Sequence, residues 1–452
     1  MKKNLKKKTG SSVSKKKISG KKISAQTKTK KKKESLAIIG TGIAGMGCAH
    51  FLQKEYDLTI FEKGSYIGGH TNTVDVDEDG TQIPIDTGFI VFNHVTYPNL
   101  KRLFEELNVP TKKSSMSFSV QHVPEGLEFC GSGINGLFAQ RKNFFNLKFL
   151  RLLYNINRFN KDAPKILENS KYMDYTLDEY IVKEGYHRDL LDYYLVPMSS
   201  AVWSTPDDLM LQFPIYGLVR FFLNHGFMGL DTQHQWYTVH GGSREYVKRL
   251  TAPIQDRFQL NAEVSSVENV GKKVRVTLKN GKSNLFDKVI LATHGNISLK
   301  LLKSPTPLQK ELLKEFKYQK NIATLHTDDR SMPKTKLSWS SWNYRIEKVN
   351  GKMRPYTVYW MNSLQGVSKK KNYYVSINDP GTVDRRKIIQ EIEYEHPLFS
   401  VGSLNAQARL SELNREGNVF FCGSYFRNGF HEDAFWSARE LSETLLGKRV
   451  WN

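Results

Sequence analysis

The chain has 452 residues, enough for two or three domain-sized cores, and its 39% hydrophobic and 12% aromatic residues are typical of a globular protein. Its three cysteines are scattered without a Cys-x-x-Cys pair, which argues against a disulfide framework, a zinc site and a redox dithiol. No apolar run reaches the length of a membrane span, and the N-terminus lacks the apolar core of a secretory signal, so we expect a cytoplasmic protein.

The net charge of +22 comes mostly from the N-terminus, because residues 1–33 hold 15 lysines and no acidic residue. Such a segment cannot offset its own ordering entropy, so we expect residues 1–34 to form a disordered lysine-rich tail. The tail is either a solubilising leader or an electrostatic tether to anionic phospholipid at the inner face of the plasma membrane. Nucleic acid is a third candidate partner of the tail, but the rest of the sequence contains no nucleic-acid-binding module that would support it.

The stretch Leu36–Glu62 predicts a dinucleotide site. A buried strand at Leu36–Ile39 leads into Gly40, Gly42 and Gly45, which have the G-x-G-x-x-G spacing. These glycines permit a tight turn, a close approach to a pyrophosphate and close helix packing, and the helix N-terminus then faces the phosphates. A second strand ends at Glu62, whose carboxylate can accept hydrogen bonds from a ribose diol. The alternative is an ordinary glycine-rich turn.

The next segments predict a change from strands to helices. Gly68-Gly69 forms a second glycine turn. Residues 83–92 form an apolar strand, and its interruption by Asp-Thr-Gly indicates a close approach to something bound. Residues 110–135 contain strands and turns, and residues 137–230 are helical. In this helical part Leu147, Leu150, Leu153 and Ile156 recur at helical spacing, and cationic side chains lie opposite them, at Arg141, Lys148, Arg151 and Arg158. Such a basic amphipathic helix lies on a membrane surface or in a soluble insert with a solvated face.

The central third predicts a β-meander that returns to a buried strand. A helix from Ser243 to Leu250, with Ser243 as its cap, precedes a strand near Asn261–Glu268. Asn280-Gly281 is a hairpin turn, and Phe286–Thr293 is a buried strand. A glutathione-reductase-like FAD domain has this arrangement after its first βαβ unit.

The last third predicts an aromatic strand and a terminal helix. Residues 356–361 alternate at strand period and either line a pocket for a long apolar substrate or belong to the core of a sheet. Val419–Ser424 is a strand followed by a glycine turn, and a helix runs from the Gly429–Ala434 segment to Leu446. In a flavoprotein the N-terminus of this helix would face the pyrimidine end of the isoalloxazine and stabilise its reduced, anionic form.

The order of these motifs resembles the amine-oxidase-like flavoprotein superfamily, which includes monoamine oxidases, protoporphyrinogen oxidases and phytoene desaturases. The chain is most similar to a bacterial branch of predicted NAD/FAD-binding proteins that is linked to methyl-branched, cyclopropane and furan fatty-acid modification. The segments behind this second resemblance are IDTGFIVFN at 85–93, Trp236 to Ser243, LHTDDRSMP at 325–333, WSSWNY at 339–344, YWMNSLQ at 359–365 and GFHEDA at 429–434.

The resemblance implies non-covalent FAD and a set of residues around it. The cofactor contacts that it implies are Gly40, Gly42, Ile43, Ala44, Gly45, Glu62, Lys63, Gly68, Gly69, His70, Thr71, Val264, Gly423, His431, Asp433 and Ala434. His431 and Glu432 are the candidate catalytic residues, with His70 next, and the alternative is that they only bind or orient the cofactor. No metal site is expected. His70 replaces an arginine that is common in the wider superfamily. Phe430 replaces a tyrosine of the monoamine oxidase aromatic cage and Asp433 replaces a glycine, and these two departures argue against an amine substrate.

We therefore predict an α/β fold with an α+β insert. Its glutathione-reductase-like FAD-binding Rossmann domain is assembled from residues 35–110, 236–299 and 411–452, and its mixed-sheet and helical substrate domain from residues 111–235 and 300–410. The predicted function is hydride removal from an apolar substrate by an FAD-dependent oxidoreductase, namely desaturation of methylated fatty-acyl chains on phospholipid. The alternatives are a flavin amine oxidase and a non-catalytic dinucleotide-binding protein associated with membranes.

Overall fold

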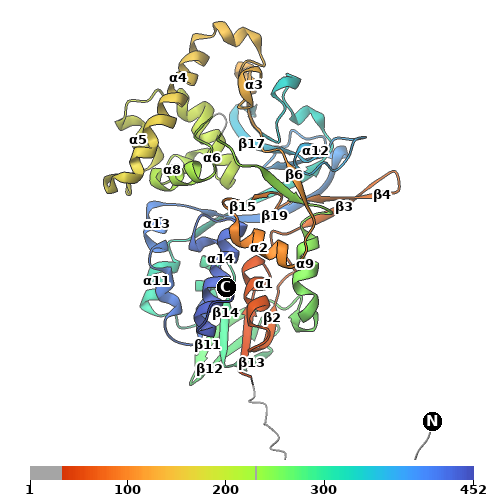
Figure 1. The fold of residues 1–452 in the computed structure, drawn as a ribbon, viewed down its shortest axis with the longest axis vertical. Coiled ribbons are helices and arrows are strands. Elements are labelled where there is room, and N and C mark those ends of the chain that lie inside the picture. The colour runs from red at the N-terminus through yellow and green to blue at the C-terminus, as the bar shows by residue number, and fades with distance from the viewer. Residues whose placement is uncertain (1–32, 230–231, 452) are drawn as a thin grey trace, which may run out of the picture. The chain divides into compact units, whose positions relative to one another are not determined.

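A five-stranded parallel sheet forms around the strand predicted at Leu36–Ile39 (Figure 1). In spatial order its strands are β10 (Phe258–Gln259), β2 (Asp57–Phe61), β1 (Ser35–Ile39), β14 (Lys288–Leu291) and β20 (Val419–Phe421). β1 pairs with β2 on one side and with β14 on the other. Its continuous apolar run is buried on both faces, as a central parallel strand requires.

The computed structural model describes residues 33–229 and 232–451. The predicted lysine-rich tail therefore lies, up to residue 32, outside the described residues. The described residues from Glu34 onward belong to one compact unit. Within the described ranges no helix is both long and apolar enough to span a bilayer.

Helices α1 (Ile43–Leu52) and α14 (His431–Leu446) pack against each other beside one face of the parallel sheet. A Cβ atom at Gly47 would lie 2.9 Å from the Phe435 ring, so glycine allows the close approach of the two helices. The helix predicted to end at Leu446 is confirmed. Two further helices pack on the same side, α2 (Pro98–Glu106) and α9 (Arg244–Thr251).

The predicted β-meander covers the other face of the sheet. It consists of β11 (Val264–Val270), β12 (Lys273–Leu278) and β13 (Ser283–Phe286). The hairpin turn between β12 and β13 contains Gly281 at φ +86°, which confirms the turn predicted at Asn280-Gly281. The helices that follow β14 or precede β20 are α10 (Gly295–Leu301), α11 (Pro307–Leu313) and α13 (Val401–Gln407).

A mixed seven-stranded sheet forms the second large layer. In spatial order it contains β19 (Ile388–Leu398), β15 (Lys317–His326), β18 (Tyr374–Ile377), β17 (Lys352–Trp360), β16 (Trp342–Val349), β7 (Phe118–His122) and β8 (Leu127–Cys130). The aromatic strand predicted at residues 356–361 is β17, the middle strand. Residues 356–359 are all buried, which favours the sheet-core interpretation, and Met361 already begins α12 (Met361–Leu364).

The helical insert lies beside this sheet and contains α3 (Gly133–Leu137), α4 (Leu147–Asp162), α5 (Leu177–Lys183), α6 (Val196–Trp203), α7 (Asp207–Met210) and α8 (Ile215–Asn224) (Figure 1). The apolar residues noted along one side of α4 are not buried at its start, although a soluble insert with its charged side in solvent would require this. Leu147 is 81% exposed and Leu150 38% exposed, whereas Phe149, Leu152 and Phe159 are buried. Phe149 and Leu152 fill the space beside β8, whereas Leu147 and Leu150 face solvent.

Residues 73–93 and 236–239 form two small sheets near the glycine turns. β3 (Thr73–Glu78) pairs with β4 (Thr81–Asp86), and β9 (Trp236–Val239) lies between β5 (Phe92–Asn93) and β6 (Thr111–Ser114). The single strand predicted over residues 83–92 is thus two strands. Asp86 ends β4 because its carboxylate accepts hydrogen bonds from the backbone N–H and hydroxyl of Ser243. For the same reason the Ser243 side chain is not the predicted helix cap.

Candidate functional site

Three glycine-bearing segments meet at the carboxyl ends of β1, β14 and β20. A Cβ atom at Gly40 would lie 2.7 Å from the carbonyl oxygen of Ala292, just after β14. A Cβ atom at Gly423, after β20, would lie 3.4 Å from the carbonyl oxygen of Thr293. The chain passes from β1 to β2 on one side, and β14 pairs on the other side. The sheet order therefore reverses at β1, where open α/β sheets form their ligand crevice.

The first glycine turn fits a dinucleotide pyrophosphate. Gly40 and Gly45 are required by the fold, because a Cβ atom at Gly45 would lie 2.0 Å from the Gly40 carbonyl oxygen. A Cβ atom at Gly42 would meet nothing within 4 Å, so the protein leaves the space in front of this residue open. Gly42 is also the N-cap of α1, with no side-chain cap and no acidic residue in the first turn. The free N–H groups of Ile43, Ala44 and Gly45 begin the helix there and favour an anion.

Glu62 lies at the end of β2, beside this turn. Its carboxylate accepts hydrogen bonds from the backbone N–H of Thr41 at 3.0 Å and from the hydroxyl of Thr41 at 2.5 Å. Lys63 follows Glu62 and is exposed. Val264 begins β11 close by, because the N–H of Ala262 donates to the Glu62 carbonyl oxygen. Thr41 was not predicted as a site residue, and the one signal for it in the sequence is its place between the first two glycines.

The second glycine turn faces the first. A Cβ atom at Gly69 would lie 3.2 Å from the Cα atom of Gly42. The next residue, His70, stacks on Tyr394 with ring centroids 5.0 Å apart. Burial and the neighbouring imidazoles of His396 and His294 hold the pKa of His70 well below its usual value. His70 is therefore a neutral imidazole at neutral pH, where an arginine would carry a fixed charge.

His431, at the start of α14, joins the same crevice. Its Nε2 atom lies 3.0 Å from the Thr71 hydroxyl and 3.1 Å from the Tyr246 hydroxyl. Phe89 stacks on the ring at 3.9 Å. Burial lowers the pKa of His431 to about 3, so the imidazole is neutral and held by three neighbours. Tyr246 and Phe89 are further residues that the sequence analysis did not single out.

Glu432 points away from this imidazole, toward α2. Its carboxylate accepts hydrogen bonds from the backbone N–H groups of Asn99 and Leu100 in the first turn of α2. These bonds place a negative charge at the positive end of a helix, which stabilises the helix. The structure thus brings His431 but not Glu432 to the crevice beside Thr71.

Asp433 and Ala434 complete the first turn of α14. Asp433 accepts a hydrogen bond from the N–H of Phe430 at 2.9 Å, and the N–H of Ala434 donates to the Phe430 carbonyl oxygen. Burial raises the pKa of Asp433 to about 7. The charge at this helix N-terminus therefore changes with pH near neutrality.

The side chain of Phe430 faces the helical insert. It stacks on Phe221 of α8 with ring centroids 5.0 Å apart and lies 6.2 Å from Trp203 of α6. The Trp203 indole N–H donates to the Asn428 carbonyl oxygen, which ties α6 to the loop before α14. An apolar, aromatic surface therefore covers the N-terminal end of α14.

Residues 43–371 match the family model described as flavin-containing amine oxidoreductase. The chain belongs to this family. It is an FAD-dependent oxidoreductase, and the open glycine turn at Gly42 fits the pyrophosphate of that cofactor.

The fold is shared with solved structures of low sequence identity. A double mutant of putrescine oxidase has a TM-score of 0.65 and 14% identity, over 92% of this chain and all of that chain. A fatty acid isomerase from P. acnes that produces CLA has a TM-score of 0.62 and 14% identity, over 92% and 98%. A putative protoporphyrinogen oxidase from Exiguobacterium sp. 255-15 has a TM-score of 0.65 and 15% identity, over 91% and 98%.

Proposed function

We propose that FAD lies across the crevice with its pyrophosphate at Gly40, Gly42 and the N-terminus of α1. The ribose of its adenosine half would bind Glu62, in place of the hydrogen bond from the Thr41 hydroxyl. The adenine would lie beside Val264, and the segment Gly68–Thr71 would flank the phosphates. His431 and Gly423 would then border the flavin end, with Asp433 behind the helix N-terminus.

We propose that the substrate is a methylated fatty-acyl chain of a phospholipid, which the enzyme desaturates. The observation that supports an apolar substrate is the stack of Phe430 on Phe221, because it covers the flavin end of the crevice with aromatic side chains. A neutral acyl chain gains from burial against these rings, whereas a charged amine would have to offset its lost hydration by cation–π contact with them alone. The fatty acid isomerase with the same fold shows that this architecture also occurs in a protein named for acyl substrates.

The reaction removes a hydride from one acyl carbon and a proton from its neighbour, and the two carbons form a double bond. Bound FAD is the two-electron acceptor of this chemistry. We propose that His431 is a positioning residue, because its Nε2 atom is already held by Thr71 and Tyr246. The proton would pass to water, because the lowered pKa values of His70 and His431 make both imidazoles weak bases.

The test is reduction of the bound flavin without oxygen. The holoenzyme is mixed with a methylated acyl phospholipid, and the flavin absorbance is followed while the lipid is analysed by mass spectrometry. We expect bleaching together with the loss of two hydrogen atoms from the acyl chain. A flavin that dithionite reduces but no acyl lipid bleaches would contradict the proposed substrate.

An amine oxidase is the second candidate, since the family is named for amine oxidation and a putrescine oxidase shares the fold. The same experiment distinguishes the two, with putrescine and other amines in place of lipid. Bleaching by an amine, and peroxide formation once oxygen is admitted, would favour the amine oxidase over the acyl desaturase.

A further inference from the structure

An apolar patch covers the start of α4 and the segment before it. Its members are Phe144, Phe145, Leu147, Leu150 and Tyr154, with exposed fractions of 45%, 89%, 81%, 38% and 67%. The last three lie on one face of α4, at spacings of three and four residues. In α3 Ile134, which is 70% exposed, adds a further apolar side chain to this region of the chain. Water-soluble proteins rarely expose such a patch without a partner.

Positive charge lies beside the patch. Residues 129–161 contain six lysines and arginines and no acidic residue, and three of the six pair with carboxylates outside this segment: Lys148 with Glu125, Arg151 with Asp189 and Arg158 with Asp162. Arg141 and Lys142 are exposed, directly before Phe144, and donate to the neutral carbonyl oxygens of Phe138 and Gly126. Lysine is depleted at protein–protein interfaces, whereas lysine and arginine beside phenylalanine and leucine are typical of surfaces that lie in the headgroup region of an anionic bilayer. The charge therefore favours lipid over a protein partner.

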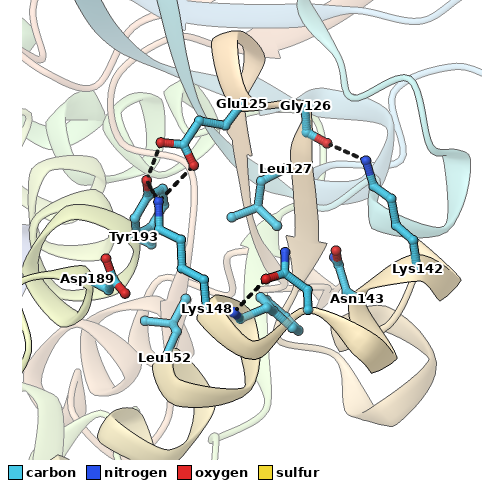
Figure 2. Close-up of a pocket in the computed structure, with 11 residues that line it drawn as sticks. Glu125, Gly126, Leu127, Lys142, Asn143, Lys148, Leu152, Asp189 and Tyr193 are labelled. Atoms are coloured by element: carbon cyan, nitrogen blue, oxygen red, sulfur yellow. Dashed lines mark hydrogen bonds and ion pairs between the residues drawn. The ribbon is translucent and has the colours of Figure 1, made fainter.

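A small polar cavity lies beside the start of α4 (Figure 2). This cavity of about 60 Å³ lies between the β7–β8 turn and the start of α4, lined by Lys142, Asn143 and Lys148 among others. The Lys148 ammonium donates to the Tyr193 hydroxyl at 2.6 Å and to Glu125 at 3.0 Å (Figure 2). A cavity that holds a benzene ring is about 150 Å³ and apolar. This polar and smaller cavity cannot take the ring of Phe145.

We propose that the apolar patch inserts into the headgroup region of an anionic phospholipid bilayer. Phe145 and Leu147 enter the acyl boundary, while Arg141 and Lys142 contact lipid phosphates. The patch belongs to the helical insert whose α6 and α8 cover Phe430, so docking places the insert between the membrane and the flavin end. This inference deepens the proposed function by giving its lipid substrate an entry side, but its test uses no turnover.

The experiment places a fluorescent probe in the patch of the full-length holoenzyme. The three native cysteines are buried, so single variants F145C and L285C are labelled with an environment-sensitive NBD dye. Leu285, in β13, is 51% exposed and is the matched control, because β13 and the start of α4 lie toward opposite ends of the long axis (Figure 1). With vesicles of phosphatidylcholine and phosphatidylglycerol, we expect a blue shift and brighter emission at position 145 and neither at 285.

A second variant distinguishes vesicle binding by the patch from vesicle binding by the lysine-rich N-terminus. At high salt, where charge is screened, we expect F145S/L147S to bind these vesicles about tenfold more weakly than the parent. We expect the control variant L285S to bind them with the affinity of the parent. A probe at 145 that stays in water while the protein sediments with vesicles would overturn the proposal and leave charge as the only tether. A lipid-free dimer that F145S/L147S dissociates would also overturn it, because a second copy would then cover the patch.

If acyl lipids fail to reduce the flavin but the probe inserts, the proposed substrate fails and the docking surface stands. If detergent-dispersed lipid reduces the flavin while the probe stays in water, the substrate stands and the docking surface fails. Each variant is accepted only when its flavin absorbance matches that of the parent.

Discussion

At the scale of single residues, the three glycines of the first turn have different neighbours. A methyl group at Gly45 would collide with the Gly40 carbonyl oxygen, whereas one at Gly42 would enter open space. We expect G45A to destabilise the protein by about 2 kcal/mol or more, with or without flavin. We expect G42A to unfold at the same denaturant concentration as the parent when both lack flavin, but to bind FAD about tenfold or more weakly.

The measurements are urea unfolding of the flavin-free proteins and titration of each with FAD. G45A is the matched control, because it adds the same methyl group three residues away. If G42A kept the parental affinity for FAD, the pyrophosphate would not approach this turn.

The same scale shows what the sequence could and could not predict. The glycine turn, Glu62 and the hairpin at Asn280-Gly281 were predictable because their signals lie within a few neighbouring residues. The partners of Asp86 were not. Its carboxylate, fully buried, is hydrogen-bonded by Ser243 and Gln365, which are 157 and 279 residues away. No local pattern encodes such pairs, so Asp-Thr-Gly was interpreted as an approach to a ligand.

At the scale of elements, amphipathic patterns predicted helices better than they predicted which face is buried. The length of α14 was confirmed because its apolar spacing and the glycine at its C-terminus agree. Which side of α4 is buried at its start could not be predicted, because this helix is apolar on two sides. Only packing against β8 decides which of the two is buried. The sequence signal of the exposed apolar patch was present but ambiguous.

The contact between Glu432 and α2 gives the prediction at this scale. The E432Q variant keeps the shape of the side chain but removes the charge that accepts two backbone N–H groups of α2. We expect a loss of about 1–2 kcal/mol in the free energy of unfolding. We expect the flavin spectrum and the rate of its reduction to stay as in the parent. A rate that fell at least tenfold in a stably folded E432Q would restore the catalytic role predicted from the sequence.

At the scale of the whole molecule, buried imidazoles dominate the dependence of stability on pH. Burial holds eight histidines below their usual pKa of 6.5. The largest shifts are those of His70, which lies well below, of His225, His326 and His396, at about 4, and of His431, at about 3. The unfolded chain binds these protons more readily, so the free energy of unfolding falls as the pH drops from about 6.5 toward 4. Four buried carboxyls oppose this trend, because their raised pKa values favour the folded state at low pH. The pKa values of Asp86, Asp207 and Asp433 lie between about 6 and about 7, and burial also raises the pKa of Glu432.

His326 isolates one such group, since it is not among the residues that border the flavin crevice. It is fully buried in β15, and its ring is held between the Ser376 hydroxyl at 2.8 Å and the N–H of Asp328 at 3.1 Å. The pKa shift from 6.5 to about 4 corresponds to ~3 kcal/mol of stability that is lost below pH 6.5. H326Q keeps a donor and an acceptor but does not titrate. In urea unfolding at saturating FAD, we expect the parent to lose stability between pH 7 and pH 4.5 and H326Q to lose less of it. Parallel losses in the two proteins would show that this imidazole is already charged in the native state.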